Sequence, residues 1–315
     1  MQAVLLDEHG PRVVDHREPT ASHEIAVVRV HLAGICNTDL ELLKGYMGFR
    51  GVLGHEFVGT VIEGPENWRG ERVVGEINFG CGRCSVCTQG MRRHCPNRRV
   101  LGILDADGAF AERVAVPVVN LHRVADDVPD EAAVFSEPLA AAFEILDQVH
   151  VDVTTECVVL GDGKLGLLVA QVLFQAGAKV LAVGKHPSKL ALLERLGLRT
   201  VASSDWDRSA VDLVVEATGT AAGFQAAIAA TRPRGTLVLK STVAEHVAHD
   251  LTPLVIHEIT VVGSRCGRFA PALDALKHRQ VDVQSLISHR FNLRDGLRAL
   301  EVAASPGVLK VLLEP

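Results

Sequence analysis

Residues 157–166 of this 315-residue chain read CVVLGDGKLG, and this stretch decides the fold of the second half of the sequence. The apolar run 157–160 is typical of a buried strand, and an amphipathic helical pattern begins at residue 164. Glycines at G-x-G-x-x-G spacing permit a tight turn, close approach of the backbone to a pyrophosphate and close helix packing, and a helix N-terminus attracts phosphate. The pattern predicts a dinucleotide-binding loop made of Gly161, Asp162, Gly163, Lys164, Leu165 and Gly166. The alternative is a glycine-rich turn that binds no ligand.

The segments that follow repeat this alternation of strand and helix. Strand-like runs at 179–184, 211–219, 236–241 and 259–264 are interleaved with helical patterns at 187–197 and 220–235. Strands alternating with helices of about ten to fifteen residues predict an α/β fold, a doubly wound parallel sheet of the Rossmann kind. After residue 265 the pattern changes to two helices joined by a short strand.

The end of the strand 179–184 bears on the choice of nicotinamide cofactor. An Asp or Glu about 20 residues after the glycine pattern would bind the adenosine ribose of NAD, but this strand ends in Gly184 without a carboxylate. Lys185, His186 and Lys189 instead crowd the start of the next helix, where cations are disfavoured unless an anion is present. We therefore predict a 2′-phosphate and NADP, the alternative being solvated lysines in an NAD enzyme.

The first 145 residues have a different texture. Short apolar runs bounded by Gly, Pro and Asn predict a mainly antiparallel β domain. A net charge of −6 with no basic stripe argues against nucleic acid as a partner, and no apolar run reaches the roughly 20 residues of a membrane span. The N-terminus lacks the pattern of a signal peptide, so we expect a cytoplasmic protein.

Four of the seven cysteines lie at C-x2-C-x2-C-x7-C spacing. In a reducing compartment such spacing indicates a metal site rather than disulfides, and four thiolates leave zinc no open position. We predict a structural zinc held by Cys81, Cys84, Cys87 and Cys95; the alternative is four free thiols in a loop.

A second candidate group lies in 34–39 (GICNTD) and 54–56 (GHE). It offers a thiol, an imidazole and two carboxylates, and the neighbouring glycines suggest close backbone approach. Taken singly, Cys36 is more typical of a small buried hydrophobe and His55 of a core histidine. Periodicity alone does not show that these groups meet.

The chain resembles the zinc-dependent medium-chain alcohol dehydrogenase superfamily, on its polyol and sugar dehydrogenase side, across its whole length. The matching stretches are GICNTD, GHEFVGTV, the four-cysteine lobe, DGAFAERVAV, SEPLAAAFEIL, VVLGDGKLG, VVEATG and GVLKVLLEP. The resemblance implies a GroES-like catalytic domain over 1–147 and 269–315, and a Rossmann NAD(P)-binding domain over 148–268.

The resemblance also implies roles for individual residues. A catalytic zinc would be held by Cys36, His55 and Glu137, with water or substrate oxygen as the fourth ligand and Glu56 beside the metal. Asp39 would orient the histidine ligand, and Thr38 would take the proton of the alcohol. Lys310 falls where relatives place a basic residue near the pyrophosphate, and Glu41 stands where many relatives end the proton relay with a histidine.

The combined interpretation is a dehydrogenase with two zinc ions per chain and a preference for NADP. It would interconvert a small-molecule alcohol, such as a polyol or secondary alcohol, and a ketone or aldehyde, as a homodimer or homotetramer. Two alternatives stay open: a metal-free enone or quinone reductase, and a catalytically silent NAD(P)-binding regulatory protein.

Overall fold

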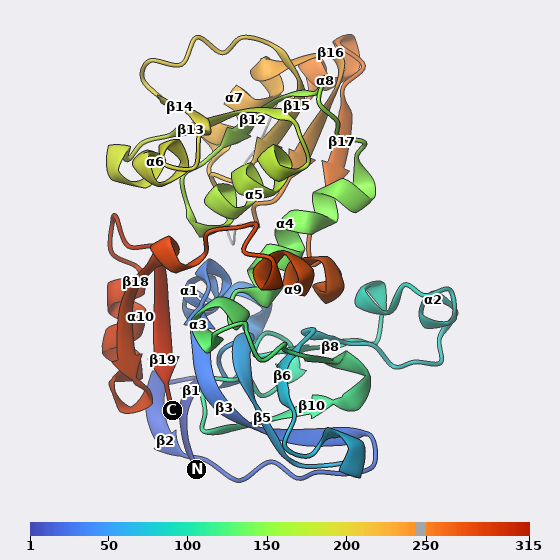
Figure 1. Ribbon diagram of the computed structural model, residues 1–315, viewed down its shortest axis with the longest axis vertical. Coiled ribbons are helices and arrows are strands. Elements are labelled where there is room, and N and C mark those ends of the chain that lie inside the picture. The colour runs from blue at the N-terminus through green and yellow to red at the C-terminus, as the bar shows by residue number, and fades with distance from the viewer. Residues whose placement is uncertain (243–249) are drawn as a thin grey trace. The chain divides into compact units, whose positions relative to one another are not determined.

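The computed structural model describes residues 1–242 and 250–315, which form two compact units (Figure 1). Unit 1 comprises Met1–Glu137, Phe269–His278 and Leu286–Pro315. Unit 2 comprises Pro138–Arg268 and Arg279–Ser285. Unit 2 is thus inserted into unit 1 along the sequence.

The limits of the units differ from the predicted ones at two places. Unit 1 ends at Glu137 rather than at residue 147, because helix α4 (Ser136–Gln148) belongs to unit 2 from Pro138 on. Residues 279–285 also belong to unit 2. The side chain of Gln171 explains this, because its Nε2 donates to the carbonyl of Asp282 at 3.1 Å and its Oε1 accepts from the Asp282 amide at 2.7 Å.

Unit 1 is mainly antiparallel sheet, as predicted. Within the described residues its largest sheet has seven strands, in the order β11-β6-β5-β3-β19-β18 with β10 also paired to β3. The bounds are β3 (Ile25–Ile35), β5 (Glu56–Glu63), β6 (Arg72–Gly75), β10 (Arg113–Pro117), β11 (Leu121–Arg123), β18 (Ile287–Asn292) and β19 (Lys310–Glu314). Two smaller sheets pair β1 (Gln2–Asp7) with β2 (Gly10–Asp15) and β4 (Gly51–Val52), and β8 (Arg99–Leu101) with β7 (Asn78–Phe79) and β9 (Asp105–Ala106).

The helices outside unit 2 are short. They are α1 (Asn37–Leu43), α2 (Ser85–Thr88), α3 (Asp130–Ala133), α9 (Phe269–Lys277) and α10 (Gly296–Ala303), with 3-10 turns η1 (Tyr46–Gly48), η2 (Glu66–Trp68), η3 (Arg92–His94), η4 (Val118–Asn120) and η6 (Leu293–Asp295). The turn η5 (Gln284–Leu286) lies at the boundary between the units. The predicted two helices joined by a strand after residue 265 are α9, β18 and α10.

The register of the large sheet brings distant parts of the sequence together. Gly34 of β3 lies opposite Glu56 of β5, and Ile35 lies opposite Val311 of β19. Because β3 runs antiparallel to both neighbours, its C-terminal end meets their N-terminal ends. Cys36, which follows β3, is therefore placed beside the start of β5 and the start of β19.

Unit 2 carries a parallel sheet in the order β14-β13-β12-β15-β16-β17. The strands are β12 (Glu156–Leu160), β13 (Lys179–Gly184), β14 (Arg199–Ala202), β15 (Val211–Glu216), β16 (Thr231–Leu239) and β17 (Thr260–Gly263); the helices after α4 are α5 (Lys164–Gln175), α6 (Pro187–Glu194), α7 (Ala221–Ala230) and α8 (Thr252–Ile256). Figure 1 shows strands and helices alternating through this unit. The predicted doubly wound sheet is confirmed, and α8 is an addition to it.

The strand order of unit 2 reverses at β12. The chain runs outward through β13 and β14, then returns to the other side of β12 with β15. Right-handed crossovers in opposite directions place α5 and α6 on one face and α7 on the other, and ligands bind beyond the strand ends at such a reversal. The loop 161–166 follows β12 at this point. Among the described residues, no helix has both the length and the apolar character of a membrane span.

Candidate active site and cofactor loop

Cys36, His55 and Glu56 come together at the end of the large sheet of unit 1. One ligand atom from each residue, a sulfur, an imidazole nitrogen and a carboxylate oxygen, lies within 4.8 Å of the other two. His55 and Glu56 are buried, and Cys36 is partly exposed. Thiolate, imidazole and carboxylate are the three donor types that zinc binds in proteins.

Two glycines allow this close approach, as the sequence suggested. Gly54 has a φ of +96°, and a Cβ on it would overlap the ring of Phe110. A Cβ on Gly34 would overlap the Glu56 carboxylate. Gly54 therefore needs to be glycine because of its positive φ and the nearby Phe110 ring. Gly34 needs to be glycine only because the Glu56 carboxylate lies so close.

Asp39 holds two members of the cluster in place. Its Oδ2 accepts a hydrogen bond from the Cys36 amide at 2.8 Å, and its Oδ1 lies 3.2 Å from His55 Nδ1. The side chain is fully buried. Because Nδ1 faces Asp39, the other ring nitrogen of His55 is left for a metal, which is the arrangement expected of a carboxylate that orients a ligand.

Glu56 also forms a buried ion pair. Lys310 Nζ donates a short hydrogen bond to Glu56 Oε2, and the same ammonium lies 5.3 Å from the centre of the Phe135 ring. Glu56 Oε1 is buried without a hydrogen-bond partner among the described residues. An orphaned carboxylate oxygen beside a thiol and an imidazole is the environment that a divalent cation would satisfy, so the residues present fit zinc.

The electrostatics of His55 are dominated by its neighbours. Burial by itself would lower the pKa of His55, but the negative charge and hydrogen bond of Asp39, together with Cys36, raise this pKa well above its ordinary value. The metal-free protein therefore favours a protonated imidazole. Since only the neutral ring binds metal, metal binding at this site must release that proton.

The other predicted site residues lie at various places in unit 1. Thr38 Oγ1 is 3.8 Å from Cys36 Sγ. Glu41 accepts a hydrogen bond from Lys44 at 2.8 Å, so the structure gives it an ion pair on α1. Glu137 is buried near the start of α4, but it is not part of the ligand group that Cys36 and His55 form with Glu56. Its role as third ligand stays a prediction, as does the relay role of Glu41.

Lys310 was predicted near the cofactor pyrophosphate, and the ion pair with Glu56 was missed. No sequence motif indicates this ion pair, because Lys310 approaches Glu56 only when β19 pairs with β3. A role for Lys310 at the pyrophosphate stays a prediction.

The four-cysteine lobe is assembled around α2 and η3. The ligand atoms of Cys81, Cys84, Cys87 and Cys95 all lie within 4.8 Å of one another. Cys95 Sγ is 3.6 Å from Cys81 Sγ and 3.7 Å from Cys84 Sγ. A tetrahedron with Zn–S bonds of about 2.3 Å has edges of about 3.8 Å, so these sulfur–sulfur distances fit a zinc ion.

The thiols of the lobe also favour a cation. Amide hydrogen bonds from Arg83 and Cys84 lower the pKa of Cys81 to about 6, and the amide of Cys81 lowers the pKa of Cys95. Burial and the neighbouring thiols raise the pKa of Cys87 to about 12. Cys81 and Cys95 thus favour the thiolate form, whereas Cys87 favours the neutral thiol. A bound cation would stabilise the thiolate form of all of them.

The loop between β12 and α5 has the features expected of a dinucleotide site. Gly161 has a φ of +117°, and a Cβ on it would meet the carbonyl oxygen of Ala217 at 2.5 Å. Gly166 packs against the backbone of Gly161. Gly163 differs, because no atom of the described residues lies within 4 Å of the position of its Cβ. Internal packing does not require glycine there, whereas close approach of a ligand to the backbone does.

The end of β13 contains contacts that sequence reasoning missed. Asp162 Oδ2 accepts hydrogen bonds from the amides of Lys185 at 2.7 Å and His186 at 2.6 Å. Lys185 is exposed, whereas Lys189 is buried. A carboxylate thus adjoins Lys185 and His186 at the start of α6, and the binding of a cofactor phosphate there stays a prediction.

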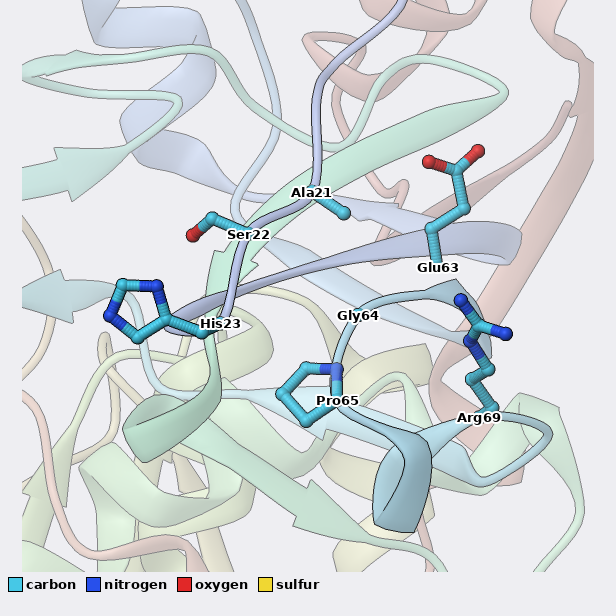
Figure 2. Close-up of a pocket in the computed structure, with 7 residues that line it drawn as sticks. All are labelled: Ala21, Ser22, His23, Glu63, Gly64, Pro65 and Arg69. Atoms are coloured by element: carbon cyan, nitrogen blue, oxygen red, sulfur yellow. The ribbon is translucent and has the colours of Figure 1, made fainter.

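A shallow depression lies elsewhere on unit 1 (Figure 2). It has a volume of about 440 Å³ and is lined by Ala21, Ser22, His23, Glu63, Gly64, Pro65 and Arg69. It contains none of the predicted site residues. We assign it no role in catalysis.

A metal-binding β unit with an inserted Rossmann unit defines a class of dehydrogenases, and the comparisons agree with this class. The family model for the alcohol dehydrogenase GroES-like domain matches residues 22–126, and that for the zinc-binding dehydrogenase matches residues 165–278. The chain belongs to the zinc-dependent medium-chain alcohol dehydrogenase superfamily. It is an NAD(P)-dependent alcohol dehydrogenase of that family.

The relatives include a polyol dehydrogenase and two solved structures with a bound nicotinamide cofactor. The sorbitol dehydrogenase of Halalkalibacterium halodurans is 28% identical, covering 100% of this chain and 99% of the relative. A protein of Sinorhizobium meliloti 1021 described as a zinc-binding dehydrogenase, solved with NADP, is 30% identical with a TM-score of 0.89 over 100% of this chain and 99% of that one. An alcohol dehydrogenase of Escherichia coli CFT073, solved with NADH, is 25% identical with a TM-score of 0.91 over the same shares.

Proposed function

We propose that this chain is a zinc-dependent, NADP-preferring dehydrogenase that interconverts a polyol or secondary alcohol with the matching carbonyl compound. The observation that carries the proposal is the buried group of Cys36, His55 and Glu56, in which one carboxylate oxygen has no partner among the described residues. A metal-free enone reductase or a silent nucleotide-binding protein has no need of such a group, whose burial is costly without a cation.

Residues of unit 1 would bind the zinc, accept the alcohol proton and orient His55. Cys36 and His55 would hold the zinc together with one carboxylate, which is Glu56 by proximity or Glu137 by family resemblance. Zinc, when bound, supplies a Lewis acid that favours loss of the alcohol proton and polarises a carbonyl. The Thr38 hydroxyl, close to Cys36, would accept the proton from the alcohol, and Asp39 would keep His55 in the orientation that binds metal.

The preference for NADP rests on the start of α6. β13 ends in Gly184 without an acid, and Lys185 is exposed next to it. Lys189 is 8% exposed, and no hydrogen bond or ion pair joins its side chain to the described residues. A largely buried lysine that has no counter-ion among the described residues favours an anionic ligand, such as a 2′-phosphate. The relatives solved with NADP and with NADH leave both cofactors open to this chain.

The substrate class follows from the relatives. The sorbitol dehydrogenase matches this chain from end to end, which supports a polyol or another alcohol with vicinal hydroxyls as substrate. The free thiols of both metal groups fit a reducing compartment such as the cytoplasm.

A homodimer or homotetramer is the last part of the proposal. Among the strands formed by residues 1–242 and 250–315, β17 is an edge strand of the unit 2 sheet. Exposed apolar side chains gather on β17 and on and beside α8, namely Leu251, Val255, Ile256 and Val261. An unpaired, apolar sheet edge favours pairing with another copy. Light scattering on the purified chain measures the oligomeric state.

The test of the catalytic metal is the zinc content per chain beside turnover. We expect two zinc ions in the parent, one in Cys36→Ala, and two in Cys157→Ala, a matched control in which a buried thiol outside both groups is removed. The parent and the control should oxidise sorbitol or related polyols with NADP, and Cys36→Ala should not. One zinc in all three proteins would refute a metal at Cys36. Glu56→Ala and Glu137→Ala, assayed in the same way, identify the third ligand.

A further inference from the structure

The carboxylate of Asp162 lies at the end of β13 although the residue belongs to the loop after β12. Its Oδ2 accepts the amides of Lys185 and His186 and lies 3.0 Å from His186 Nδ1. Partial burial would raise the pKa of Asp162, but these hydrogen bonds hold it below its ordinary value. Asp162 is therefore ionised at neutral pH.

Gly184 explains why β13 itself supplies no acid. A Cβ on Gly184 would lie 2.6 Å from the Cβ and 2.7 Å from Oδ2 of Asp162. Any side chain at this position would thus collide with Asp162. The carboxylate of Asp162 occupies the space into which a residue at the strand end would project, which is the place where an acid that binds the adenosine ribose normally begins.

The second oxygen of Asp162 is available to a ligand. The three contacts of its carboxylate all converge on Oδ2, and none of its hydrogen bonds to the described residues uses Oδ1. An ionised carboxylate accepts ribose hydroxyls well and repels a phosphate. The site therefore holds two opposed elements, the cations Lys185 and Lys189 that attract a 2′-phosphate, and the acid that opposes it.

We propose that Asp162 is a specificity-determining residue, whose free carboxylate oxygen accepts a ribose hydroxyl of NAD and limits the preference for NADP. The inference rests on the proposed function, because it assumes that the loop binds a nicotinamide dinucleotide. It makes Asp162 the replacement for the missing acid of β13, and it makes NAD a usable second cofactor.

Asp162→Asn separates this role from the role of holding the turn. The Asn side-chain oxygen can accept the amides of Lys185 and His186 as Oδ2 does, while its NH2 group takes the place of Oδ1. The turn is kept, and only the charge and the outward acceptor are lost. Asp152→Asn is the matched control, because Asp152 also accepts a backbone amide, that of Thr154 at 2.8 Å, in a turn of the same unit.

The experiment measures the dissociation constants of NADH and NADPH with the full chain by fluorescence titration, without substrate. We expect Asp162→Asn to raise the ratio of the NADH constant to the NADPH constant by about tenfold or more, the usual effect of a hydrogen bond to a charged group. Asp152→Asn should leave the ratio unchanged. The double variant Asp162→Gly with Gly184→Asp, which removes the colliding Cβ and returns an acid to the strand end, should bring the ratio back towards that of the parent.

An unchanged ratio in Asp162→Asn, or equal weakening of both cofactors, would overturn the inference and leave Asp162 as a residue that only holds the turn. A shifted ratio in a protein that oxidises no alcohol would support the inference and refute the proposed reaction. A parent that binds neither cofactor would refute both. Thermal unfolding of each variant shows whether it is folded.

Discussion

Lys310 and Glu56 form an ion pair whose side chains are 1% and 0% exposed. The two residues are 254 positions apart in the sequence and meet because β19 and β5 both flank β3. A buried pair of this kind stabilises the fold little as a unit, but either charge alone is costly. The pair also neutralises one oxygen of Glu56 and leaves the other for a metal.

Removing one partner of this pair should therefore destabilise the metal-free protein strongly. We expect Lys310→Met to lower the free energy of unfolding by about 3–5 kcal/mol, since it leaves a buried carboxylate unpaired. The double variant Lys310→Met with Glu56→Gln should recover much of this loss, because it removes both charges. Urea denaturation in the presence of a chelator measures the change in the free energy of unfolding for both variants. Equal losses in the single and double variants would show that the lysine acts by packing alone.

Asp39 should affect metal affinity more than stability. Asp39→Asn weakens the hold on His55 Nδ1 and on the Cys36 amide, and loss of such a supporting carboxylate typically costs about 10–100-fold in metal affinity. Glu41→Gln is the matched control on the same helix, because Glu41 pairs with Lys44 outside the ligand group. Competition with a chelator gives the affinity of the more weakly held zinc in each protein. If Asp39→Asn retained the parent affinity, the orienting role of Asp39 would be wrong.

The sequence predicted the doubly wound sheet well, because each strand and helix of unit 2 is a local pattern with its own periodicity. The group of Cys36, His55 and Glu56 was different. Its members were found as residue types, but their meeting depends on the pairing of β3 with β5, which no local pattern encodes. The contacts of Lys310 with Glu56 and of Asp162 with the residues after β13 were missed for the same reason, since both join segments that only the strand pairing brings together.

The affinity of the Cys36 site for zinc should fall as the pH falls. The pKa of His55 is raised well above its ordinary value in the metal-free protein, so a proton competes with the metal at every pH below that raised value. Because zinc must displace one proton from His55, each pH unit below the raised pKa lowers the zinc affinity by about tenfold. In the metal-free protein, by contrast, the stability of the fold falls as the pH rises. The protonated pair with Asp39 stabilises the fold fully below the unfolded pKa of about 6.5, and this contribution is lost as the pH rises through the folded pKa.

The difference in bound zinc between the parent and Cys36→Ala isolates this site, and it should be followed from pH 6 to pH 9 at a fixed chelator concentration. Asp39 is the main group that raises the pKa of His55. Asp39→Asn should therefore move the onset of the fall to lower pH. An onset at the same pH in both proteins would mean that the titrating group is not His55.

Gly163 offers a test of the cofactor loop that leaves the fold intact. Its φ of −76° and ψ of 172° suit alanine, and in the described part of the chain no atom lies within 4 Å of the added Cβ. Gly163→Ala should therefore fold with a free energy of unfolding within about 1 kcal/mol of the parent, as expected for a change at an N-cap position. The new methyl group would occupy the space through which a pyrophosphate approaches the backbone, so we expect the affinity for NADPH and NADH to fall together by about tenfold or more.

Gly263→Ala is the matched control, because its Cβ also enters open space among the described residues of unit 2. Fluorescence titration measures the affinity of both variants for NADPH and NADH. Full affinity in Gly163→Ala would show that the dinucleotide does not pass over this glycine. A loss of affinity in both variants would show that the substitutions disturb unit 2 as a whole.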